Sequence, residues 1–166
     1  MALIGGCSSP PQASDDVRKV GGRSFRVPSN VVVNPTPDSL AFYMRGSDFG
    51  LLDEHTRGER LFIQIQSDRQ PDVASAIVGL RRHGGVLGRE VYGGLTPVSG
   101  AGEDAHYFIQ NRYGGASIFC PVDGWECRAR VPYRDLSISI RFPQARLSSW
   151  MSVIDGVLTK VESLEV

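Results

Sequence analysis

The sequence predicts an α+β fold, with an antiparallel sheet packed on one face by a C-terminal helix and one further helix. Several short segments alternate between apolar and polar residues, as strands with one buried face do. Glycine (19) and proline (10) are abundant and favour turns and short strands over long helices. Near the end of the chain, apolar residues repeat at helical spacing. At 166 residues the chain has the length of one domain.

The expected strands follow this alternation along the chain. The clearest is 136–142, where Leu136, Ile138 and Ile140 fall on one face and small or charged residues on the other. Such one-sided strands belong to an antiparallel sheet that leaves one face wet or loosely covered. The other expected strands are 24–27, 31–33, 39–44, 60–66, 106–111, 116–119 and 128–131.

Two segments have the features of helices. The first starts at Asp72, a candidate N-cap, carries Arg81 and Arg82 in its last turn, and ends at Gly84. The second starts near Leu147 and has an apolar stripe that the strand faces can bury. The stripe consists of Leu147, Trp150, Ile154, Val157, Leu158 and Val161. Gly156 lies inside this helix and costs it about 1 kcal/mol relative to alanine, unless packing requires the glycine.

The charge balance narrows the classes of partner. Eighteen basic and 18 acidic residues give a net charge of zero, so the whole chain has no general attraction for nucleic acid or anionic lipid. We therefore expect no nucleic-acid partner. No apolar stretch is long enough to predict a membrane-spanning helix.

The N-terminus resembles the end of a bacterial lipoprotein signal peptide. Ile4-Gly5-Gly6-Cys7 fills the four positions of the processing box, and a polar, proline-rich stretch follows. The resemblance implies residues 1–6 as residual signal peptide and a lipid on Cys7. The composition of the residues that follow predicts a flexible tether over 7–22, and the rest of the chain, 23–166, is then a single α+β domain. Contact with the membrane would then be through the lipid anchor alone. Ser8 and Ser9 stand where aspartate would favour inner-membrane retention, which implies a periplasmic protein anchored to the outer membrane.

The other two cysteines fit an exported protein. Cys120 and Cys127 flank Asp123-Gly124, a strong hairpin-turn signal, and strand-like residues lie on both sides. Facing positions of an antiparallel pair can meet the geometry of a disulfide, so we predict that these cysteines are bonded. The alternatives are a metal site, although the spacing is wider than zinc pairs use and no second pair exists, and two unlinked core cysteines.

The chain has no phosphate-binding loop and no recognisable catalytic motif, and we expect no cofactor and no bound metal. Glycine and proline predict a long loop over 93–104, of a length that is often functional. His106 could act as a general base with the nearby carboxylates of Glu103 and Asp104. A polar, solvated loop before a strand explains these residues equally well. The local group Asp48, Asp53, Glu54 and His55 matches no known ligand spacing.

The remaining signals favour protein binding. Trp125, beside the hairpin turn, is either an exposed interface anchor or a cover for the disulfide or for a face of the sheet. The chain as a whole resembles immunity lipoproteins that neutralise type VI secretion effectors. The shared features are the processing box, the small β-rich domain and a closing helix with Leu147, Trp150 and Ile154. That resemblance implies a non-enzymatic inhibitor whose protein partner is a secreted effector enzyme. Its expected contacts are Glu103, Asp104, Asp123 and Trp125. The alternative is a structural or assembly lipoprotein of the cell envelope.

Overall fold

The computed structural model describes residues 15–33, 36–68, 73–100, 104–109 and 115–166. Several positions singled out in the sequence lie outside this part of the chain. They include the processing box 4–7 with the lipidation candidate Cys7, Ser8, Ser9, the helix cap Asp72, the loop residue Glu103 and residues 110–111 of an expected strand.

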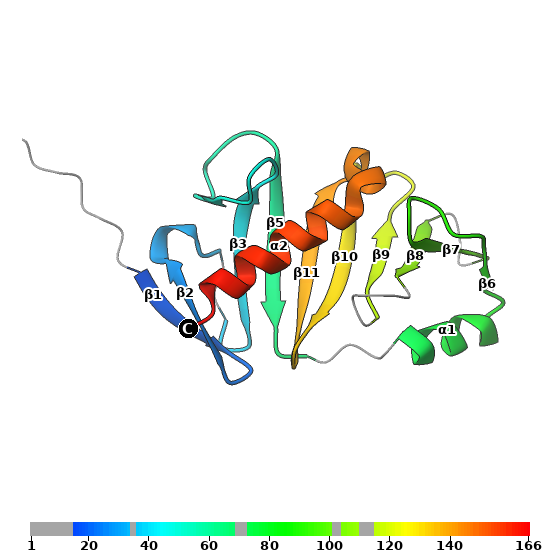
Figure 1. The fold of residues 1–166 in the computed structure, drawn as a ribbon, viewed down its shortest axis with the longest axis horizontal. Helices are drawn as coiled ribbons and strands as arrows, with labels where there is room; N and C mark the ends of the chain where they lie inside the picture. Colours follow the sequence, from blue (N-terminus) through cyan, green and yellow to red (C-terminus); the bar gives the residue numbers. More distant parts are fainter. Residues whose placement is uncertain (1–14, 34–35, 69–72, 101–103, 110–114) are drawn as a thin grey trace, which may run out of the picture.

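A nine-stranded antiparallel sheet forms the body of the molecule, in the order β4-β3-β5-β11-β10-β9-β8-β7-β6 (Figure 1). Its strands are β3 (Ser39–Arg45), β4 (Leu51–Leu52), β5 (Arg60–Gln66), β6 (Val86–Leu87), β7 (Leu95–Ser99), β8 (Ala105–Ile109), β9 (Ser117–Cys120), β10 (Glu126–Tyr133) and β11 (Leu136–Pro143). A two-stranded sheet precedes it, formed by β1 (Asp15–Val20) and β2 (Arg23–Pro28). The helices are α1 (Val73–Arg82), α2 (Trp150–Leu164) and the 3-10 turns η1 (Ser29–Val31) and η2 (Gln144–Ser149). The predicted α+β class is confirmed.

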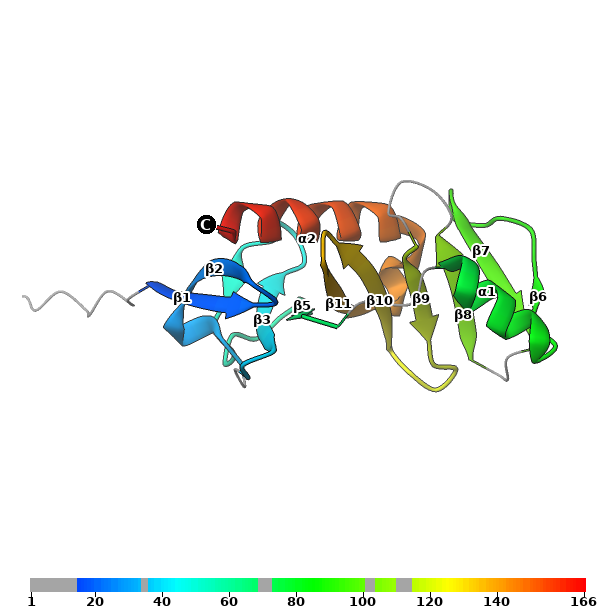
Figure 2. The same cartoon turned by 90° about the horizontal axis from the view of Figure 1, so that it is seen from below.

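The hydrophobic core lies between one face of the sheet and α2, which runs along that face (Figure 2). Side chains alternate between the two faces of a strand, so one apolar set per strand points toward the helix. On β11 this set includes Ile138, Ile140 and Phe142, all fully buried, and Ile140 pairs with Ile63 of β5. The apolar stripe of α2, with Trp150 at its start, covers this layer.

Gly156 allows α2 to approach the loop between β3 and β4. A Cβ atom on this glycine would lie 2.1 Å from the Cε2 and Cζ atoms of Phe49. Phe49 itself has a φ of 58°, a conformation that bulky residues rarely adopt. The glycine that appeared costly for the helix is therefore required by packing.

The C-terminal residues are fastened to β2. The backbone N–H of Val166 donates to the carbonyl of Ser24 on β2 (3.0 Å). Arg23 forms ion pairs with Asp135 and with Glu165, the latter at 2.6 Å. Because β1 pairs with β2 along its whole length and Val20 is 1% exposed, the fold already includes residues 15–22. The tether predicted over 7–22 therefore extends too far into the domain.

Two other segments differ from the sequence-based expectations. The expected strand 31–33 begins inside η1, and Val32 makes just an isolated bridge to Phe42. The valine-rich composition misled the prediction because Val31 is buried as part of a turn, outside any ladder. The expected loop 93–104 contains β7, whose Leu95 and Val98 are buried. Here the positive φ values of two glycines mark a turn that leads into a strand.

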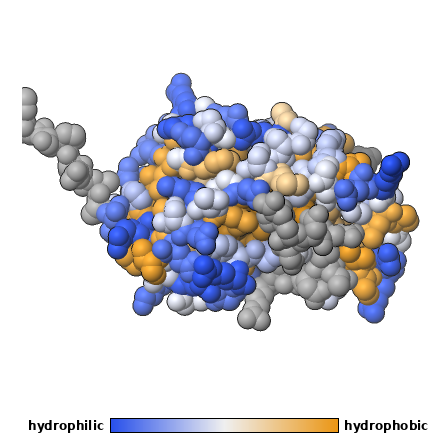
Figure 3. Space-filling view, in the orientation of Figure 1, coloured by the Kyte–Doolittle hydropathy of each residue, from blue (hydrophilic) through white to orange (hydrophobic). Residues whose placement is uncertain are grey.

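Helix α1 ends as the sequence indicated. Gly84 has a φ of +82°, and the N–H of Gly85 donates to the carbonyl of Leu80 (2.8 Å), as in a glycine-terminated helix. This helix lies near β8 and β6 in both ribbon views (Figures 1 and 2). Exposed apolar residues gather at this end of the molecule (Figure 3), among them Val78 and Val86. Within the described residues, neither helix is long and apolar enough to cross a membrane.

Candidate partner-binding surface

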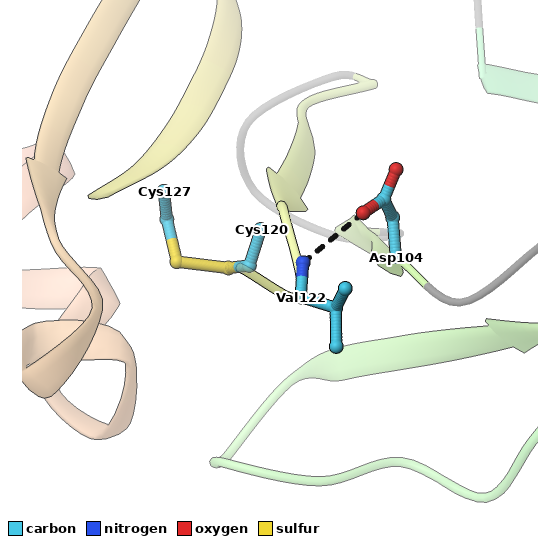
Figure 4. The surroundings of a disulfide bond; sticks show 4 residues. All are labelled: Asp104, Cys120, Val122 and Cys127. Carbon is cyan, nitrogen blue, oxygen red and sulfur yellow. Dashed lines mark hydrogen bonds between the residues drawn. A yellow bond between two sulfur atoms is a disulfide. The ribbon is translucent and has the colours of Figure 1, made fainter. Parts of the chain in front are cut away.

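A disulfide joins Cys120 at the end of β9 to Cys127 at the start of β10, across a tight hairpin (Figure 4). The turn closes through a hydrogen bond from the N–H of Gly124 to the carbonyl of Pro121 (3.1 Å). Asp104, which directly precedes the neighbouring strand β8, accepts a hydrogen bond at Oδ1 from the N–H of Val122 (3.0 Å). The hairpin backbone is therefore fixed from two directions.

Trp125 projects from this hairpin and is 74% exposed. It does not fold back over the disulfide. Its carbonyl accepts a hydrogen bond from the N–H of Gln144 at the start of η2 (2.8 Å), so its backbone is held while its indole faces solvent. Asp123, two residues before it in the turn, is also exposed. Of the predicted contact residues, Asp104, Asp123 and Trp125 thus lie together at one end of the sheet, and Glu103 falls outside the described residues.

The face of the sheet opposite α2 carries a row of aromatic and basic side chains. On β11 the neighbours Ile140 and Phe142 point to the core, so Arg141 points to the other face. Cross-strand pairing continues from Arg141 in both directions through β3, β5, β10, β9 and β8. The successive pairs are Tyr43 with Phe62, Phe62 with Arg141, Arg141 with Arg128, Arg128 with Phe119, and Phe119 with His106.

The members of this row contact one another. The rings of Tyr43 and Phe62 lie 5.3 Å apart, and those of His106 and Phe119 lie 4.9 Å apart. The Arg141 guanidinium lies 5.1 Å from the Phe62 ring centre, within the range of a cation–π contact. Such stacked side chains lose less conformational freedom on binding than free ones, which favours their use in an interface.

A groove of about 810 Å³ lies over one part of this row. Its walls are the loop at 54–60 and the hairpin residue Trp125, and Tyr43, Phe62 and Arg141 also line it. A smaller pocket of about 260 Å³ continues beside Trp125, and Phe119 and Arg128 line it. The exposed tryptophan therefore stands between two adjoining depressions.

Ion pairs fix the loop wall of the groove. The Arg146 Nε atom lies 3.0 Å from the Glu59 carboxylate, and its Nη1 atom donates to the carbonyl of Gly46 (2.6 Å). On the face of the sheet opposite α2, which we call the open face, Arg130 forms an ion pair with Asp68 (3.2 Å). Arg128 and Arg141, by contrast, have no acidic partner among the residues that the structure describes.

The structure shows the contacts of several residues that were considered for catalysis or metal binding. Asp104 is engaged with Val122, and the imidazole of His106 lies against Phe119, without a hydrogen bond between Asp104 and His106. No group of three potential metal ligands occurs in the described parts of the chain. Hydrogen bonds from the Gly50 N–H and from Arg45 lower the pKa of Asp48, so this carboxylate already has partners.

Sequence reasoning missed the aromatic and basic row. Alternation alone indicates that Arg141 faces away from the core, and the same holds for Phe62 and Arg128 on their strands. Alternation does not reveal the order and register of the strands, and these place the side chains in one row. Nothing in the local sequence around β5 shows that it lies beside β11.

No protein-family model and no curated protein sequence matches this chain. Solved structures do resemble it. One is Smlt3025, an immunity protein of the Stenotrophomonas maltophilia type IV secretion system, with a TM-score of 0.68 and 14% identity over 93% of this chain and 94% of that one. Another is FrpD, the iron-regulated outer membrane lipoprotein of Neisseria meningitidis, with a TM-score of 0.55 and 10% identity over 90% and 92% of the two chains. At these identities the likeness is one of fold.

Proposed function

We propose that this protein is a membrane-anchored, non-enzymatic immunity protein that binds a secreted antibacterial effector and covers its active site. The observation that carries the proposal is Trp125, a large side chain that is 74% exposed on a backbone fixed by the disulfide. Exposing an indole to water gives the isolated protein no stability, whereas buried tryptophans dominate the energetics of many protein interfaces. The adjoining groove supplies a surface into which a partner segment fits.

The fold likeness to an immunity protein supports the same reading. That neighbour belongs to a type IV secretion system, so the comparisons give no support to the type VI system that the sequence suggested. We leave the secretion system out of the proposal. The likeness to FrpD favours a second candidate, a structural or assembly lipoprotein of the cell envelope.

The location of the protein is part of the proposal. We propose that Cys7 carries a lipid and anchors the domain in the periplasm, at the outer membrane. Cells that express the chain are labelled with radioactive palmitate, and membrane fractions are then separated. The wild-type protein is expected to take up label in the outer-membrane fraction, and Cys7→Ala to stay unlabelled in the soluble periplasm. Wild-type protein without label in a cytosolic fraction would contradict the anchor.

Binding is tested by capture with the full chain from periplasmic extract and culture medium of its own organism, followed by mass spectrometry. We expect one secreted hydrolase, whose activity is lost in the complex. Trp125→Ala should lose this capture, and Val78→Ala should retain it. Val78 is a suitable control because it is also exposed, at 50%, and lies on α1. Capture of envelope components alone would refute the inhibitor function and favour the assembly role.

A further inference from the structure

Arg128 of β10 and Arg141 of β11 are directly opposite each other in the antiparallel register. Both are exposed, and both line the 260 Å³ pocket beside Trp125. Like charges at directly opposed positions of a sheet repel and destabilise it. A pair of this kind on an open face therefore has a cost for the isolated domain.

The nearby acidic groups do not neutralise this pair. Glu59, in the loop wall, forms its ion pair with Arg146, and Asp68 pairs with Arg130. Glu126 lines the same pocket, but no ion pair joins it to either arginine. Within the described residues, two guanidinium groups therefore share a pocket without an ion pair to either of them.

Aromatic side chains lie beside both arginines. Arg141 lies 5.1 Å from the ring centre of Phe62, and stacking on a ring leaves the N–H edge of a guanidinium free to donate. Phe119, paired with Arg128, and Trp125 supply apolar walls on either side. The pocket is thus lined both by hydrogen-bond donors and by aromatic side chains.

We propose that Arg128 and Arg141 form an anion subsite that receives a carboxylate side chain from a segment of the protein partner. The subsite rests on the proposed function, because it names the chemistry of the segment that this surface binds. Paired arginines match the planar, two-oxygen geometry of a carboxylate. A nucleic acid fits less well, since its chain of phosphates would also meet Glu54 and Glu126 along the groove.

The subsite can be tested without knowledge of the partner. A fluorescently labelled random copolymer of glutamate and tyrosine is titrated with the full chain in low salt, and anisotropy reports binding. A lysine–tyrosine copolymer is the charge-reversed control. Arg128→Gln and Arg141→Gln should each weaken binding of the acidic copolymer about tenfold. Glu126→Gln should strengthen binding about two- to threefold, because it removes a competing acid.

The matched control is Arg82→Gln, which removes an exposed cation at the end of α1 and should leave binding unchanged. Urea unfolding of each variant shows whether it folds. A further variant, Arg141→Lys, keeps the positive charge but replaces the planar guanidinium group by an ammonium group. Binding by Arg141→Lys should fall between that of wild type and Arg141→Gln. Equal binding of both copolymers, or unchanged binding by folded Arg128→Gln and Arg141→Gln, would overturn the subsite. So would arginine-dependent binding of a DNA oligonucleotide with greater affinity than the acidic copolymer.

The two proposals fail separately. If the full chain captures and inhibits a hydrolase but the arginine variants do so equally well, the inhibitor function stands and the subsite falls. If the acidic copolymer binds through both arginines but no hydrolase is captured, the subsite stands and the inhibitor function falls.

Discussion

Replacing Gly156 by alanine tests whether the contact with Phe49 holds α2 in place. In an exposed helix interior this substitution stabilises a protein by about 1 kcal/mol, because it reduces the conformational freedom of the unfolded chain. In this structure the new methyl group would lie 2.1 Å from two atoms of the Phe49 ring. Carbon atoms pack at about 3.5–4.0 Å, so the ring must move by about 1.5 Å or leave the site.

The size of the effect follows from what the ring loses. A fully buried phenylalanine contributes roughly 1.5–3 kcal/mol, and overpacking of a core costs about 1–3 kcal/mol. Phe49 is only partly buried, so we take about 2 kcal/mol for its displacement. Subtracting the helix-propensity gain leaves a net destabilisation of about 1 kcal/mol for Gly156→Ala.

The assay is urea unfolding of the full chain, monitored by circular dichroism. Gly79→Ala in α1 is the matched control, because a Cβ there meets no atom within 4 Å and should stabilise by up to about 1 kcal/mol. In a Phe49→Ala background, Gly156→Ala should change sign and stabilise as well. If Gly156→Ala stabilises the wild-type protein as much as Gly79→Ala does, the packing explanation is wrong.

Three further predictions concern the disulfide-linked hairpin, the C-terminal residue Glu165 and the loop wall of the groove. Reducing the disulfide should lower the free energy of unfolding by about 2.5 kcal/mol and the melting temperature by roughly 5–10 °C, as measured by calorimetry with and without reductant. Hydrogen bonds from Tyr133 and Arg23 lower the pKa of Glu165, so its stabilising effect is complete above the unfolded pKa and is lost as pH falls below it. Glu165→Gln should therefore reduce stability at pH 7 and flatten the loss of stability below about pH 4.5, whereas an unchanged acid slope would contradict this role. Arg146→Ala should accelerate hydrogen exchange in the loop around Glu59, because it removes the ion pair that holds the groove wall, and unchanged exchange would show that the wall stands without it.

Much of the fold could be predicted because its signals are local. The alternation in β5 and β11 gave their positions closely, and the apolar stripe gave α2. Strand β1 was missed because Asp15–Val20 is mostly polar, and just Val20 is buried, so the strand depends on pairing with β2. The short edge strand β6 has too few residues for any periodicity to show.

The candidate surface could be predicted in one part and not in the other. The hairpin was accessible because Asp123-Gly124 and the two cysteines lie within a few residues of one another. The pairing of Arg128 with Arg141 depends on the register between β10 and β11, and the position of Phe62 beside them on the order of the sheet. These relations between distant segments are set by tertiary packing, which a single sequence does not display.

The most direct test of the proposed binding surface is hydrogen–deuterium exchange of the full chain, alone and in complex with the captured hydrolase. We expect slower exchange in the complex at the hairpin 120–127 and in the loop 54–60, which border the groove on the open face of the sheet. Exchange along α2, on the opposite face, should stay as it is in the free protein. Protection confined to α2 or to the β1–β2 hairpin would show that the partner binds elsewhere.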